Sequence, residues 1–264
     1  MTPYILHDSH DPIPMALVCR EPYGGNQAST FPTIRDVLIS ISEFNNASTR
    51  TPQNAAFHAA IDNAKHTLFI QTPDLNAEPL LEPLLNAVRR GVIVTAFLSL
   101  GYNYAGQLLP YQNGTNEMIS NRLYNSLSSD EEKARLRIFN YVAKDQTRPI
   151  HNKFKQRSCH IKLMIVDEQV AIQGSGNLDT QSYFHSQEAN LLLDSPQICR
   201  EWMEALRRNQ NTAEYGAVST DDGCWHDPET GKIADGSLGI NPGRFSWFKG
   251  IAGAINRIRG AGGF

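Results

Sequence analysis

The residues best suited to chemistry in this sequence lie between Cys159 and Glu188. One residue separates His160 from Lys162, and the apolar pattern of this stretch predicts a β-strand. Alternate residues of a strand face the same side, so an imidazole and an ammonium would share one wall of a pocket. A nucleophile or base beside a cation suits reactions at an anionic centre.

A second polar group follows the next predicted strand. Ser175 stands between Gly174 and Gly176, and Asn177 comes directly after them. Glycines let a backbone approach an anion closely, while the hydroxyl and the carboxamide donate hydrogen bonds. Glu188 begins a further apolar run and supplies a carboxylate that can orient the imidazole. These residues together predict a phosphate-binding pocket.

A sheet with flanking helices must position these groups. The apolar periodicity predicts strands over 15–19, 67–71, 92–100, 136–142, 159–167, 169–173 and 189–193. It predicts helices over 31–44, 51–64, from the N-cap Asn76 to residue 90, over 116–127, and from about 128. Asp167 and Glu168 form the tight connection between two of the strands. The alternation of strands and helices predicts an α/β fold with some parallel pairing.

Composition excludes several classes of protein. The chain has 264 residues and a net charge of −3, so it is long enough for a sizeable core and carries no overall field that attracts polyanions. The segment 144–162 is the exception, with six basic residues against Asp145. Four widely spaced cysteines indicate neither a zinc site nor a disulfide framework. The sequence shows no signal peptide or membrane-spanning stretch, which predicts a cytoplasmic, not secreted, protein that is soluble or peripheral to a membrane.

The order of the chemical residues resembles a known signature. The segments are His160-x-Lys162-x4-Asp167, then Gly174-Ser175-Gly176-Asn177-Leu178-Asp179, then Ser182 and Glu188. This is similar to the HKD motif of the phospholipase D superfamily, in its cardiolipin synthase and phosphatidyltransferase branch. The segments 70–76 and 87–92 resemble the strand, helix and Arg-Gly-Val that precede the motif there, so the resemblance covers about 52–210. A looser similarity, to fungal members, involves 209–212 and the glycine-rich C-terminus.

The resemblance implies an α/β fold with a phospholipase D-like mixed sheet flanked by helices on both faces. It also implies two-step transfer through a covalent phosphohistidine, with no metal and no cofactor. His160 is the implied nucleophile at phosphorus. Lys162 and Asn177 would hold the non-bridging phosphoryl oxygens, with Ser175 as a further donor. Glu188 would accept a hydrogen bond from the far ring nitrogen and fix the tautomer of the imidazole.

Two features depart from the simplest expectation. Asp167 is the third letter of the motif but stands at a strand end, so we expect a structural role for it. Members of the superfamily use two motifs because a second histidine protonates the leaving alcohol, and this chain has one. His151 and Lys153 begin a similar pattern, but Ser158 stands where the acid belongs. They are instead candidate accessory cations near the phosphate.

Three interpretations of the single motif follow. A homodimer could bring two copies of His160 together. The chain could instead be the C-terminal half of a two-motif enzyme, or pair with a chain that supplies the N-terminal half. Finally, it could be a catalytically silent half that acts as an assembly partner.

The expected organisation has three parts. They are a loop-rich arm with one helix over 1–50, a phospholipase D-like catalytic half-domain over 51–210, and an extension over 211–264. The extension contains a candidate amphipathic helix at 245–259 for peripheral membrane contact. We expect a phospholipid substrate. Nucleic acid is the less favoured one because the chain is acidic overall, and a nuclease-like homodimer is the alternative.

Overall fold

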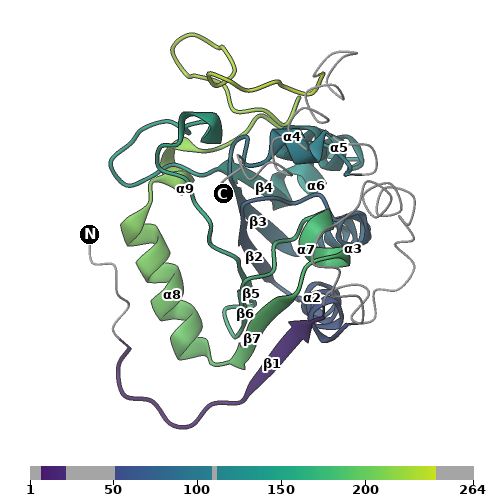
Figure 1. Ribbon diagram of the computed structural model, residues 1–264, viewed down its shortest axis with the longest axis vertical. Helices are drawn as coiled ribbons and strands as arrows, with labels where there is room; N and C mark the ends of the chain where they lie inside the picture. Colours follow the sequence, from purple (N-terminus) through teal and green to yellow (C-terminus); the bar gives the residue numbers. More distant parts are fainter. Residues whose placement is uncertain (1–6, 22–50, 109–111, 242–264) are drawn as a thin grey trace, which may run out of the picture.

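The computed structural model describes residues 7–21, 51–108 and 112–241. Seven strands form one mixed sheet (Figure 1). They are β1 (Met15–Arg20), β2 (Thr67–Thr72), β3 (Ile93–Leu98), β4 (Leu136–Asn140), β5 (Leu163–Val166), β6 (Val170–Gly174) and β7 (Glu188–Asp194). The helices are α2 (Pro52–Asn63), α3 (Glu78–Arg89), α4 (Tyr104–Gln107), α5 (Asn116–Asn125), α6 (Asp130–Arg135), η1 (Asn152–Phe154), α7 (Thr180–Phe184), α8 (Pro196–Asn209) and α9 (Thr212–Tyr215).

The strand order is β1-β7-β6-β5-β2-β3-β4. β2, β3 and β4 are parallel, because helices carry the chain back between them. β5 runs antiparallel to β2 and continues through β6 and β7 as a meander. The predicted α/β fold with some parallel pairing is therefore confirmed.

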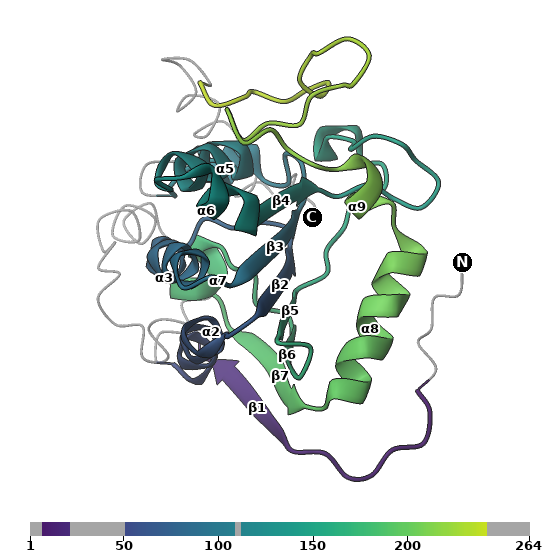
Figure 2. The same ribbon diagram turned by 180° about the vertical axis from the view of Figure 1, so that it is seen from behind.

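Helices cover both faces of the sheet. Along β2, Leu68 and Ile70 face the core beneath α2 and α3, whereas Phe69 faces the opposite core, where α8 packs. This alternation follows from the two-residue period of a strand. Figure 1 and the reverse view in Figure 2 show α8 on one side of the sheet and α2, α3 and α7 on the other. The expected helices on both faces are confirmed.

The helix starts agree with the sequence in one case and differ in another. Thr51 caps α2 by accepting a hydrogen bond from the Asn54 amide at 3.3 Å. The predicted cap of the next helix is wrong, because α3 starts after Ala77 without a side-chain cap. The Asn76 side chain instead accepts from the Thr180 amide at 2.9 Å. It therefore ties the loop after β2 to the start of α7, close to the motif.

The strand predicted over 159–167 begins later than expected. β5 starts at Leu163, so His160 and Lys162 lie in an irregular segment that leads into it. The predicted connection at Asp167 and Glu168 is present, and both residues have left-handed φ angles of 51° and 54°. Such angles match the twist of a two-residue hairpin turn.

The first described segment belongs to the same sheet. β1 pairs with β7 in antiparallel register, with Met15 opposite Leu193 and Arg20 opposite Glu188. Part of the expected N-terminal arm is thus an edge strand beside the motif. The helices expected over 31–44 and 245–259 lie outside the described residues. Within 7–21, 51–108 and 112–241, no helix has the length and apolarity needed to cross a membrane.

Candidate active site

His160 and Lys162 differ sharply in exposure, contrary to the shared wall expected from a strand. His160 is exposed, and its imidazole stacks on the ring of Tyr102, with centroids 5.4 Å apart and planes 17° from parallel. Lys162 is only 8% exposed, and its Nζ donates a hydrogen bond of 2.8 Å to the His160 carbonyl. The ammonium therefore lies beneath the backbone that carries the imidazole.

The environment shifts the pKa of both groups downward. Burial and the Lys162 charge lower the pKa of His160 from its ordinary 6.5, against the opposing charge of Glu188. Burial lowers the pKa of Lys162 to about 8, although Glu188 and Asp179 oppose the shift. At neutral pH the imidazole is thus uncharged, with a lone pair for attack, while the lysine is mostly protonated.

Glu188 acts on the imidazole through its charge. Its two carboxylate oxygens accept hydrogen bonds from the hydroxyls of Ser175 and Ser182, at 2.5 and 2.7 Å. The expected hydrogen bond from the imidazole to Glu188 is not present among the described residues. The Glu188 side chain is buried, and the two serines fix its position.

Ser175 and Asn177 have different capacities to hold a phosphoryl group. The Ser175 hydroxyl donates to Glu188, so its proton is already committed, contrary to the expected role as phosphate donor. Asn177 donates to Asp179 at 3.0 Å, and its second amide hydrogen remains for a ligand. The Asn177 Oδ1 is buried without a hydrogen-bond partner in the described structure. Asn177 is thus the better placed of the two.

The glycines of the motif make room for protein atoms. A Cβ at Gly174 would lie 2.3 Å from the Ala189 carbonyl oxygen, and one at Gly176 would lie 2.5 Å from Gln53 Oε1. Glycine is required at both positions because these protein atoms leave no room for a Cβ. Its absence of a side chain lets the loop after β6 pack against β7 and α2.

Asp167 lies at the opposite end of β5 from His160. Its carboxylate accepts hydrogen bonds from the backbone amides of residues 65, 66 and 67, at 3.0, 2.8 and 2.9 Å. Burial alone would raise its pKa, but these three amides and the nearby His66 hold the pKa below its ordinary value. The aspartate thus anchors the start of β2, which agrees with the expected structural role.

His151 and Lys153 lie on a loop beside the site. Burial and the Lys153 charge lower the pKa of His151 to about 4, so His151 is neutral at pH 7 and supplies no cation there. Its ring packs edge-on against Tyr104, with centroids 4.7 Å apart. Lys153 is exposed and retains the role of candidate accessory cation.

Several residues of the site were not predicted from the sequence. Tyr102, on the loop after β3, has no periodic or motif signal, and only the fold brings it against His160. Asp74 and Asp179 are buried near Lys162, and burial raises the pKa of both carboxyls. Both carboxyls lie near the Lys162 ammonium and oppose the downward shift of its pKa. Over the described ranges, no group of three or more His, Cys, Asp or Glu side chains is arranged to hold a metal.

The fold and the site define a class of protein. A neutral, exposed imidazole and a buried ammonium precede β5, the central strand of a mixed α/β sheet, and this pair suits nucleophilic chemistry at a phosphodiester. Residues 57–209 match the family described as "Cardiolipin synthase, PLD-like domain". The chain belongs to this family, and so to the phospholipase D-like phosphodiesterase superfamily.

Solved structures resemble the chain at low sequence identity, and the first one described here shares its fold. Phosphatidylserine synthase from Haemophilus influenzae aligns over 80% of this chain and 41% of its own, with 12% identity and a TM-score of 0.52. Nuc from Salmonella typhimurium aligns over 62% and 90%, with 18% identity and a TM-score of 0.44. NucT from Helicobacter pylori aligns over 79% and 100%, with 13% identity and a TM-score of 0.43. A search of curated proteins gave no significant match.

Proposed function

We propose that the protein is a phosphodiesterase or phosphatidyltransferase that acts on phospholipid diesters through a covalent phosphohistidine on His160. The observation that carries the proposal is the 2.8 Å contact between Lys162 Nζ and the His160 carbonyl. This contact holds a cation against the backbone that carries the nucleophile, and in the proposed reaction it would offset the negative charge that builds up on the phosphoryl oxygens during attack. Asn177, which is hydrogen-bonded to Asp179, would supply a neutral donor.

The reaction proceeds in two balanced steps. An imidazole nitrogen of His160 forms a bond to phosphorus, the bond from phosphorus to the leaving alcohol breaks, and that alkoxide takes up a proton. In the second step water or an acceptor alcohol loses a proton and attacks phosphorus, and the bond between phosphorus and nitrogen breaks. Both steps need a group that exchanges a proton with the alcohol.

We infer that a second copy of the chain supplies this group. His160 is exposed, so a partner's imidazole can approach the same phosphate across a twofold axis. A chain with an N-terminal half-motif is the other source of the second histidine. If neither partner binds, the chain has no catalytic activity of its own and acts only as an assembly partner.

The first experiment compares activity on phospholipid vesicles with activity on a single-stranded oligonucleotide. The enzyme should release phosphatidate or a transphosphatidylated lipid, and His160→Ala should abolish the product. His66→Ala is the matched control, because His66 is also exposed but lies at the far end of β2. Acid-labile phosphate on a peptide containing His160 would support the covalent step. Cleavage of the oligonucleotide alone would contradict the lipid substrate.

A mixing experiment tests the half-site. Wild-type and His160→Ala chains, allowed to exchange in equal amounts, should retain roughly a quarter of the activity if each site needs both histidines, and roughly half if each chain acts alone. Light scattering on the same samples gives the oligomeric state. A monomer without activity on any diester would support the silent half.

A further inference from the structure

Five large apolar residues are exposed in the described part of the chain. Two of them, Met15 and Leu17, lie on the edge strand β1, and the other three lie on loops. These three are Phe154, Ile161 and Ile233, with exposed fractions of 46%, 38% and 39%. Such side chains are costly in water unless another surface covers them.

Phe154 stands on a strongly basic loop. Residues 148–157 contain four basic side chains and no acid, namely Arg148, Lys153, Lys155 and Arg157. Arg157 pairs with Asp145 from outside this segment. The Lys153 ammonium lies 4.8 Å from the centre of the Phe154 ring, and Lys155 follows with a left-handed φ of 55°. The loop therefore presents an aromatic ring between two cations.

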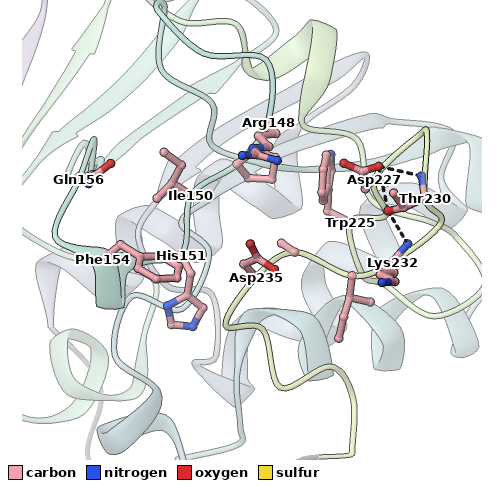
Figure 3. A pocket seen from close by; sticks show the side chains of 13 residues that line it. Arg148, Ile150, His151, Phe154, Gln156, Trp225, Asp227, Thr230, Lys232 and Asp235 are labelled. Carbon is pink, nitrogen blue, oxygen red and sulfur yellow. Dashed lines mark hydrogen bonds between the residues drawn. The ribbon is translucent and has the colours of Figure 1, made fainter.

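Phe154 and Ile233 line one cavity of about 340 Å³ between this loop and residues 225–235 (Figure 3). Arg148 and Lys232 add cations to its wall, and Asp227 and Asp235 are its acids. The Asp227 carboxylate already accepts hydrogen bonds from the Thr230 amide and hydroxyl, at 2.8 and 2.9 Å. Asp227 also interacts with the Arg148 charge, so both acids oppose the cations of this wall.

Non-covalent contacts connect the loop 148–157 to His160, the proposed nucleophile. The Asn152 side chain donates to the Tyr102 carbonyl at 3.0 Å, and Tyr102 stacks on His160. Ile161 is the residue after His160 and is exposed on the same segment. The exposed side chains of Phe154 and Ile161 therefore belong to two segments that are connected to His160.

We propose that the loop 148–157, together with Ile161 and Ile233, docks the protein on an anionic phospholipid surface. Phe154 and the two isoleucines enter the interfacial region, and Lys153 and Lys155 contact the lipid phosphates. Isoleucine side chains offer no stacking surface for a base, which favours lipid over nucleic acid as the partner. The inference extends the proposed function by naming the face that meets the substrate.

Vesicle sedimentation tests the docking without turnover. The full chain should bind vesicles of phosphatidylcholine with phosphatidylglycerol, and bind phosphatidylcholine alone much more weakly. Phe154→Ser should lower the partition coefficient about tenfold. Lys153→Gln and Lys155→Gln should each lower it about fivefold. Leu17→Ser and Lys65→Gln are the matched controls, because both residues are exposed far from this loop, and they should bind as wild type.

Equal binding by Phe154→Ser and wild type, or an equal loss in Leu17→Ser, would overturn the proposal. So would tight binding of a single-stranded oligonucleotide through Lys153 and Lys155 without vesicle binding. A soluble phosphodiester separates the two proposals. Cleavage of it that depends on His160, without vesicle binding, would contradict only the docking, whereas vesicle binding without any cleavage would contradict only the proposed function.

Discussion

The imidazole of His160 lies almost parallel to the ring of Tyr102, with their centroids 5.4 Å apart. Stacking of this kind restrains a side chain that is otherwise exposed, and an aromatic face also favours a positive charge on the ring beside it. A phosphohistidine carries such a charge. Tyr102 is therefore a positioning residue for the proposed nucleophile.

We expect Tyr102→Leu to lower kcat/KM on a soluble phosphodiester by about tenfold, because the stacking energy of roughly 1 kcal/mol is lost and the imidazole gains freedom. Tyr102→Phe keeps the ring and should retain most of the activity. The NMR titration of His160 should shift to lower pH in Tyr102→Leu. An unchanged titration together with unchanged kinetics would exclude the positioning role.

The pKa of Lys162, about 8, predicts that anion binding depends on pH. The lysine holds its charge below this pKa and loses it as the pH rises. Affinity for sulfate, whose own charge is constant in this range, should fall about tenfold between about pH 7 and about pH 9. Calorimetric titration measures it. Lys162→Arg stays protonated and should remove this dependence. The same slope in both proteins would mean that another group controls binding.

Asp167 should matter for stability and not for chemistry. Asp167→Ala removes three hydrogen bonds to backbone amides and leaves an alanine at a φ of 51°, so we expect a loss of about 2–3 kcal/mol in the free energy of unfolding. Asp167→Asn tolerates the same φ and should lose about 1 kcal/mol. Urea denaturation gives both values.

The folded fraction of Asp167→Ala should keep its activity, because the site lies at the other end of β5. Loss of activity in a fully folded variant would instead assign Asp167 a chemical role.

We expect Arg20 to stabilise the packing of β1 against the end of α7, within the motif segment. Its buried guanidinium donates to the carbonyls of Tyr183 at 2.9 Å and of Ser186 at 2.6 Å, and also to that of Phe184. Arg20→Met would remove these hydrogen bonds at the end of α7, at a cost of about 3 kcal/mol, although the Tyr183 carbonyl would still accept from the Asn54 side chain at 2.9 Å. Hydrogen exchange should increase in 180–190. Leu17→Met, on the exposed face of the same strand, is the control and should change neither quantity. Unchanged exchange in Arg20→Met would show that the strand and the motif are independent.

Much of this protein follows from local sequence. The two-residue period of β2 and the apolar stripe of α3 are carried by consecutive residues, so the strands between 51 and 210 and the helices α2, α3, α5 and α6 were predictable. The helices α4, α7 and α8 were not predicted. Motif spacing likewise brought His160, Lys162, Asn177 and Glu188 into one hypothesis, since the chain order of these residues is itself the signal. The turn at Asp167 and Glu168 is equally local.

Other features depend on contacts between distant segments, which no local pattern encodes. The start of β5 was predicted too early because its pairing with β2 begins only at Leu163, opposite Gln71. Asn76 binds Thr180 in place of capping its own helix, and Glu188 binds two serines in place of the imidazole.

What the sequence determined by itself is the set of chemical groups and the sheet that carries them. Only the tertiary structure decided that Lys162 is buried beneath an exposed His160, and that Tyr102 lies against the imidazole. The physical reason is that burial and ring stacking are properties of the packed environment. The pKa of each group follows from the neighbours that packing supplies, whatever its position along the chain.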